Sequence, residues 1–309
     1  MKIVFRLALG LVLTVLVAAV VAYWWTGRGL QPLNDEARLA APGKFLTLPE
    51  GKLFYRWDGP EQGPVVVMVH GFSISSPVFD HNVPALVAKG YRVLRMDNWG
   101  RGWSDRPDIR HDSDLFDRQL LGALDALGVK DKIELIGFSM GGGIATSFAT
   151  RHPERVNKLV LLAPAGIYFE VPFAVRLASA PVIGQWLMRV FGRKVVLAPP
   201  LIGGPNTELE IIAAYDNSAK YPGYLESLSY SLRDYPLRNL EPDFEKVGSL
   251  GKPVLLVWGD KDTVVPYALA PRAAKLTKGT LITVKDALHG ANMQYPQIFD
   301  AAVADFLSH

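Results

Sequence analysis

The distribution of apolar residues differs between the N-terminus and the rest of the chain. One apolar run extends from Leu7 to Trp25. From about Phe45 onward, short apolar runs alternate with stretches of helical periodicity, and the exception is the region 168–246. Strands are expected at 45–48, 52–57, 64–70, 91–96, 132–136, 158–162, 253–258 and 280–284, and helices at 115–127 and 140–151. This alternation predicts an α/β fold, with a mostly parallel central sheet flanked by helices on both faces.

The region 168–246 interrupts the alternation. It is rich in aromatic residues and prolines and contains one amphipathic stretch, Phe173–Phe191. Because it follows a strand of an open α/β sheet, we expect a helical cap above the edge where ligands bind. The predicted organisation is an anchor at 1–27, a juxtamembrane segment at 28–43, a core at 44–167 and 247–309, and a cap at 168–246.

The run from Leu7 to Trp25 predicts an N-terminal transmembrane helix. At about 1.5 Å per residue it would span roughly 28 Å, close to the hydrocarbon thickness of a bilayer. Lys2 and Arg6 precede the run, and Tyr23–Trp25 close it as an interfacial aromatic belt would. A cleaved signal peptide and a buried core helix are the alternatives. The length and the closing aromatics favour an uncleaved single-pass anchor, with the catalytic domain on the non-cytoplasmic side, which is periplasmic in a bacterium.

Composition excludes several classes of function. The 309 residues carry a net charge of +3, and Lys and Arg are interspersed with nearly as many acidic residues, so nucleic acid is not an expected partner. With no cysteine, the chain has no disulfide, thiol nucleophile or cysteine-based zinc site. The expected partners are a membrane and a lipid or other apolar ester substrate. A lone anchor with a juxtamembrane segment is also compatible with a homodimer formed through that region.

Gly-Phe-Ser-Met-Gly at 137–141 carries the candidate nucleophile, Ser139. It follows an expected strand and opens an expected helix, which is the context of a nucleophile elbow. The flanking glycines remove side chains that would clash in so tight a turn. The helix N-terminus also offers free N–H groups to a developing oxyanion.

A serine hydroxyl needs a general base, and six histidines are available. His289 lies just beyond the last strand, where a loop would reach Ser139, so we predict that it is the base. His70 ends a strand and is expected to be a structural loop residue. His81 and His111 lie in polar stretches and are expected on the solvated surface.

The remaining parts of a serine hydrolase site also have candidates. Asp260 and Asp262 follow the strand 253–258, and either could orient the imidazole. Asp262 is preferred because it lies further into the loop, whereas Asp260 would cap the turn. The oxyanion hole is expected from the N–H of Met140, after the nucleophile, and that of Phe72, in the loop after the strand 64–70.

Five motifs in order resemble the α/β-hydrolase superfamily. They are His-Gly-Phe at 70–72, the segment 97–104, Gly-Phe-Ser-Met-Gly at 137–141, Gly-Asp-Lys-Asp at 259–262 and His-Gly at 289–290. The resemblance implies an α/β-hydrolase fold in which 97–104 shapes a turn and is not catalytic. The anchor and the segment Ala163–Gly166 are further similar to membrane-anchored monoacylglycerol lipases and bacterial inner-membrane phospholipases A.

These features lead to a hydrolase of carboxylic esters of lipids, acting through an acyl-enzyme on Ser139 without a cofactor or metal. The alternative is a carbon–carbon bond hydrolase or a cofactor-free perhydrolase that uses the same triad. Epoxide hydrolases and haloalkane dehalogenases are disfavoured because they need a carboxylate in place of Ser139. A non-enzymatic membrane protein on this scaffold would be expected to lack a triad residue, and none is missing.

Overall fold

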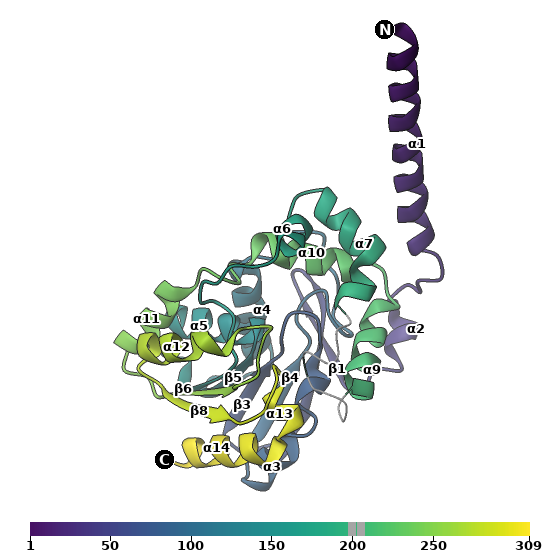
Figure 1. The fold of residues 1–309 in the computed structure, drawn as a ribbon. Helices are drawn as coiled ribbons and strands as arrows, with labels where there is room; N and C mark the ends of the chain where they lie inside the picture. The colour runs from purple at the N-terminus through teal and green to yellow at the C-terminus, as the bar shows by residue number, and fades with distance from the viewer. Residues whose placement is uncertain (197–201, 203–207) are drawn as a thin grey trace.

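The computed structural model describes all 309 residues except 197–201 and 203–207. Eight strands form one sheet in the order β1-β2-β4-β3-β5-β6-β7-β8 (Figure 1). The pairs β1–β2 and β2–β4 are antiparallel, and the other five pairs are parallel. The strands are β1 Lys44–Leu48, β2 Gly51–Asp58, β3 Val65–Val69, β4 Arg92–Met96, β5 Ile133–Phe138, β6 Val156–Leu162, β7 Val254–Gly259 and β8 Thr280–Val284. The predicted α/β fold class is confirmed.

Helices cover both faces of this sheet. One face packs against α4 (Ser113–Ala126), α5 (Met140–Arg151), α11 (Glu241–Ser249) and α12 (Ala270–Thr277). The other packs against α3 (Val83–Ala88) and α14 (Pro296–Ser308). Short elements complete the core: η1 Ser76–Phe79, η2 Tyr267–Leu269 and α13 Ala291–Gln294. Because successive strand residues point to opposite faces, the continuous apolar run of β3 supplies both cores, as expected for a strand covered on both sides.

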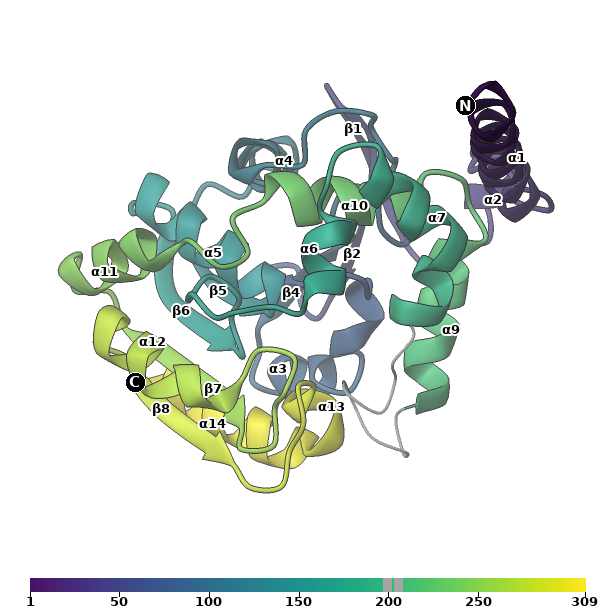
Figure 2. The same cartoon turned by 45° about the horizontal axis from the view of Figure 1, so that its top comes forward.

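The cap consists of α6 (Phe173–Ala178), α7 (Ile183–Val196), α9 (Glu208–Ala219) and α10 (Tyr224–Asp234). The stretch predicted as one amphipathic unit, 173–191, forms two helices. Pro181 lacks the N–H that a continuous helix requires, and Val182 takes a left-handed conformation with φ of 62°. The cap is joined to the loop after β3, because the Tyr224 hydroxyl donates to the Ser73 carbonyl at 2.6 Å. Figure 2 shows α6 and α10 in front of the central strands, with α7 and α9 beside them.

The N-terminal helix α1 (Lys2–Thr26) projects from the body, and none of its residues is buried (Figure 1). Its most apolar window has a mean hydropathy of 2.6, so it is long and apolar enough to cross a membrane. A signal sequence would satisfy the same criterion. Its C-terminal part contacts α7 of the cap, through Ala19 and Tyr23, whereas the rest extends away from the body (Figure 1).

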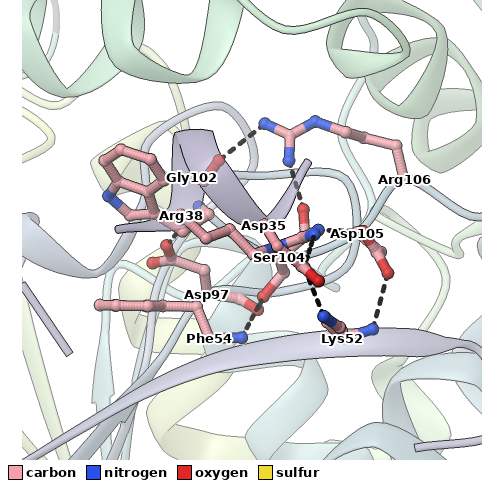
Figure 3. Close-up of polar contacts among 10 residues, drawn as sticks. Asp35, Arg38, Lys52, Phe54, Asp97, Gly102, Ser104, Asp105 and Arg106 are labelled. Carbon is pink, nitrogen blue, oxygen red and sulfur yellow. Dashed lines mark hydrogen bonds and ion pairs between the residues drawn. The ribbon is translucent and has the colours of Figure 1, made fainter. Parts of the chain in front are cut away.

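The segment after α1 is tied to the core by ion pairs (Figure 3). Arg38 of α2 (Asp35–Arg38) is buried and pairs with Asp105, and Asp35 pairs with Lys52 at the start of β2. Asp105 also accepts from the Lys52 backbone N–H at 2.6 Å. The segment 27–34 therefore connects the end of α1 to a fixed point on the core.

Candidate active site

Ser139 lies in a sharp turn between β5 and α5, with φ of 54° and ψ of −119°. Its backbone is held by hydrogen bonds from its N–H to Leu162 O and from Ala165 N–H to its carbonyl, both 2.9 Å. Both glycines of the motif are required because neighbouring backbone atoms leave no room for a side chain. A Cβ on Gly137 would lie 2.3 Å from the Gly141 carbonyl oxygen, and one on Gly141 would lie 2.1 Å from Val69 O. This left-handed turn, unusual for a residue other than glycine, has the geometry of a nucleophile elbow.

His289 and Asp262 are brought together from the loops after β8 and β7. Their Nδ1 and Oδ2 atoms are 2.7 Å apart, and both side chains are almost fully buried. The other oxygen, Oδ1, accepts from the N–H groups of Val264 and Val265 at 2.9 and 3.0 Å. A carboxylate that already accepts two N–H bonds holds the proton of His289 on Nδ1. This leaves Nε2 with the lone pair that a general base requires.

The His289 ring contacts that of Phe138, the residue before Ser139, with the ring centroids 4.8 Å apart and the planes tilted by 41°. Within the described structure, no hydrogen bond of 3.5 Å or less joins the Ser139 hydroxyl to His289. Such bonds are often long in enzymes without substrate and tighten when it binds. Asp260 has a different position, because its Oδ1 accepts from Asp286 N–H at 2.7 Å at the turn after β7.

The two residues expected to form the oxyanion hole, Phe72 and Met140, directly follow Gly71 and Ser139. Gly71 approaches the nucleophile so closely that a Cβ on it would lie 3.2 Å from the Cβ of Ser139. Met140 is the first residue of α5, where N–H groups have no partner within the helix. Among the described residues, the N–H groups of Phe72 and Met140 make no hydrogen bond. Both are therefore free to donate to an oxyanion.

Two histidines outside the pair are buried and neutral. His70 accepts from Asn98 N–H through Nε2 at 2.8 Å and bonds to Gly71 O through Nδ1 at 2.9 Å. Burial lowers its pKa to about 3, as it does for His111. The expectation that His111 is a solvated surface residue was wrong. Its side chain is fully buried because α10 of the cap packs over it, and its Nδ1 lies 3.3 Å from Ser231 Oγ.

The residue that the sequence analysis missed is Arg101, which is fully buried. Its Nε donates to Phe72 O at 2.8 Å, and its other nitrogens donate to Trp99 O and Ser231 Oγ, each at 2.9 Å. Desolvation lowers its pKa to about 9, so it keeps its charge at neutral pH. No carboxylate of the described chain forms an ion pair with it. The sequence feature that could have indicated a buried role for Arg101 is its position between two glycines in Trp-Gly-Arg-Gly-Trp, directly after a buried strand.

A cavity of about 400 Å³ lies next to this site, between α9 and the loop after β3. Its lining includes Ile74, Ser75, Ala214 and Met293, but neither Ser139 nor His289. The cavity therefore does not define the volume in which a substrate would react.

Two family models match the chain. The first, described as the alpha/beta hydrolase fold, matches residues 64–198, and the second, described as TAP-like protein, matches residues 233–309. Together they cover the strands and turns that carry Ser139, Asp262 and His289.

Known proteins of several activities are similar to the chain. A 2-hydroxy-6-oxononadienedioate/2-hydroxy-6-oxononatrienedioate hydrolase from Paraburkholderia xenovorans is 31% identical, over 87% of this chain and 96% of that protein. A non-heme chloroperoxidase from Streptomyces lividans is 28% identical, over 86% and 99%. The crystal structure of a meta-cleavage product hydrolase from Pseudomonas fluorescens is 26% identical with a TM-score of 0.67, over 86% and 97%.

None of these three proteins is named as a lipase or phospholipase. The closer resemblance to membrane-anchored lipases and phospholipases, expected from the anchor and the 163–166 segment, is therefore not supported. The carbon–carbon hydrolases agree instead with the alternative that the sequence left open.

Proposed function

Since the chain belongs to the α/β-hydrolase superfamily, we propose that it hydrolyses a carbon–carbon bond beside a ketone in an oxo acid, with Ser139 as nucleophile. The observation that carries the proposal is the buried Asp262–His289 pair, which contacts Phe138 at the Ser139 turn. The substrate class is taken from the relative that is named for an oxo dicarboxylic acid. The lipid ester expected from the sequence becomes the second candidate, which the apolar helix α1 beside the cap favours.

The first chemical step is addition of Ser139 to the ketone. His289 Nε2 takes the hydroxyl proton, and Oγ bonds to the carbonyl carbon while the carbonyl electron pair moves to oxygen. The N–H groups of Phe72 and Met140 bind that oxyanion, and each such donor is typically worth about 3 kcal/mol of barrier. Asp262 stabilises the imidazolium formed at His289.

The second step is cleavage. For a 2-hydroxy-6-oxodienoate, the dienol must first tautomerise to its 2,6-dioxo form, in which the departing carbon is saturated and lies next to a double bond conjugated with the 2-oxo group. The oxyanion then collapses, the adjacent carbon–carbon bond breaks, and its electron pair is delocalised onto the 2-oxo group as a dienolate. His289 returns its proton to the dienolate. Water, activated by the same imidazole, then hydrolyses the acyl-enzyme to a carboxylic acid. The sum is one water consumed and two products released, without a redox change.

The charge of Arg101 supports an acidic substrate. Its buried guanidinium contacts the carbonyl of Phe72 and forms no ion pair within the described structure. In a poorly solvated site its positive potential favours negative charge nearby, both on the developing oxyanion and on a substrate carboxylate.

A paired substrate assay tests the proposal. The purified chain is offered a 2-hydroxy-6-oxodienoate, whose conjugated absorbance disappears on cleavage, and p-nitrophenyl esters of short and long acids. We expect a higher kcat/KM on the oxo acid, one ¹⁸O from labelled water in the new carboxylate, and loss of turnover in Ser139→Ala. Preference for long-chain esters would select the lipid ester instead. Turnover retained in Ser139→Ala would refute both candidates.

A further inference from the structure

We propose that the cap docks on the lipid surface that α1 enters, through a docking face formed by α6, the α6–α7 turn and α7. This inference goes beyond the hydrolysis reaction and rests on α1 acting as a membrane anchor. Five large apolar residues of the docking face are exposed to solvent. Phe173 is 70% exposed and Val182 76% exposed, and Val175, Ile183 and Phe191 are also exposed.

The contacts between α1 and α7 fix the position of the docking face along the axis of α1. Trp186 Nε1 donates to Ala19 O at 2.9 Å, and Arg189 Nε donates to Tyr23 O at 3.2 Å. Both carbonyls belong to the apolar run of α1. The later residue of α7 bonds to the later residue of α1, so the two helices run in the same direction. Because α1 approaches the body toward its C-terminus, the start of α7 lies further from the body than its end. Figure 1 shows this arrangement, with the α6–α7 turn on the side from which α1 projects.

This register places the turn at the level of lipid. Ala19 lies six residues before Trp25, the end of the apolar run, which corresponds to about 9 Å along the helix axis. If α1 crosses a bilayer with that run in the hydrocarbon, Trp186 lies within the outer part of the same layer. Ile183, one turn earlier, lies deeper still. Amphipathic elements on membranes bury their apolar faces to a depth of about 5–10 Å, which fits this position.

The charges of the segment suit an anionic lipid surface. Residues 171–207 contain no Asp or Glu and four Lys or Arg residues. Two of these already have partners, since Arg189 pairs with Glu226 and Arg193 pairs with Asp216. Apolar contact therefore supplies most of the docking, and the basic residues add a preference for anionic headgroups.

Val182 supplies an independent argument. It is a β-branched residue with φ of 62° at an exposed turn. The positive φ is sterically unfavourable for a β-branched residue, and exposure of the apolar side chain to water is also unfavourable. Glycine or asparagine would fit the conformation with less strain. Contact with lipid gives the exposed aliphatic side chain a role that a solvent-facing turn does not.

Single-cysteine labelling of the full chain tests the docking, because the chain has no cysteine of its own. A fluorophore is attached at Val182→Cys or, as a control, at Ile298→Cys on α14, which is 46% exposed at the opposite end of the body (Figure 1). The proteins are reconstituted in phosphatidylcholine–phosphatidylglycerol vesicles that contain nitroxide-labelled lipid. We expect quenching at least several-fold stronger at position 182 than at 298.

Two outcomes would overturn the proposal. Equal, weak quenching at both positions would mean that the cap stays in water. Shielding of position 182 from an aqueous quencher, without lipid quenching and increasing with protein density, would mean that a second copy covers the docking face.

A second variant separates docking from folding. Val182→Asn in the full chain suits the left-handed turn, so the melting temperature is expected to stay equal or to rise. A label at Phe173→Cys should nevertheless lose most of its lipid quenching in this background. Unchanged quenching would show that the turn makes no contact with lipid. None of these measurements depends on the reaction that the enzyme catalyses, so their failure leaves the proposed function untouched.

Discussion

The replacement Asp262→Asn tests the assignment of the acid, because the contacts of Asp262 fix how an amide would sit. All three groups that face the carboxylate are N–H donors: the backbones of Val264 and Val265 on Oδ1 and the imidazole of His289 on Oδ2. An amide has one oxygen and one NH₂ group. Its oxygen should keep the two backbone bonds, which places the NH₂ group against His289 Nδ1.

That orientation gives His289 the wrong tautomer. Nδ1 must then accept a hydrogen bond, the ring proton moves to Nε2, and Nε2 loses the lone pair that would accept the Ser139 proton. A triad with this defect is slowed by about 10⁴-fold in kcat, or roughly 5.4 kcal/mol of barrier. We expect a loss of this size in turnover and in the rate of fluorophosphonate labelling at Ser139.

Asp260→Asn is the matched control, two residues away in the same turn. Its carboxylate accepts a single backbone bond, from Asp286 N–H, which an amide oxygen can also accept. We expect a change in turnover of less than about threefold, which is under 1 kcal/mol. The assignment is refuted if Asp262→Asn stays within tenfold of the parent, or if Asp260→Asn loses as much activity.

Three further predictions concern Arg101, the two buried neutral histidines and α1. Arg101→Met should lower kcat by about tenfold to hundredfold, because the Phe72 carbonyl loses its hydrogen bond and the neighbouring oxyanion donor shifts. It should also raise KM for an acidic substrate, because the positive charge is removed; equal kcat in a folded variant would contradict this. Since the folded-state pKa of His70 and His111 is about 3, the unfolded chain binds their protons first as the pH falls below about 6.5. The free energy of unfolding should therefore decrease from pH 6.5 toward 3, by about 1.4 kcal/mol per pH unit for each histidine. His111→Gln should remove about one such increment in urea titrations, and an unchanged slope would argue against a neutral buried imidazole. Deleting residues 1–26 removes no buried residue, so the protein should stay folded, leave neutral vesicles and keep only weak binding to anionic ones in flotation assays; full retention on neutral vesicles would show that α1 is not the main anchor.

The fold could be predicted from the sequence because the apolar runs of the buried strands are unambiguous. The runs at 132–136 and 253–258 correspond closely to β5 and β7, and the helix expected at 140–151 is α5. Strands covered on both faces need continuous apolar residues, and the loops between them carry the turn residues. The cap was harder, since the break at Pro181 and Val182 lies inside a stretch with steady helical periodicity.

Some polar residues of the site could also be placed from the sequence, and others could not. Ser139, Asp262 and His289 each follow a strand, and a parallel sheet brings such positions to one edge, so their proximity could be expected. The burial of His111 could not. Its own neighbours are polar, and it is covered by α10, whose Ser231 lies 120 positions away. Contacts between segments this distant depend on packing that local patterns do not record.

The core and the cap hold different parts of the catalytic arrangement. Backbone bonds within the core fix the Ser139 turn. The Asp262–His289 pair joins two core loops, and the His289 loop also contacts the cap, because Gly290 N–H donates to Ile202 O at 2.5 Å. The loop that carries Phe72 depends on both. Arg101 links its carbonyl to Ser231 of α10, and α10 packs against α7, which contacts α1. A continuous series of contacts thus joins the oxyanion loop to α1. A change in cap position should therefore alter stabilisation of the oxyanion, whereas the Ser139 turn, held by Leu162 and Ala165, would stay in place.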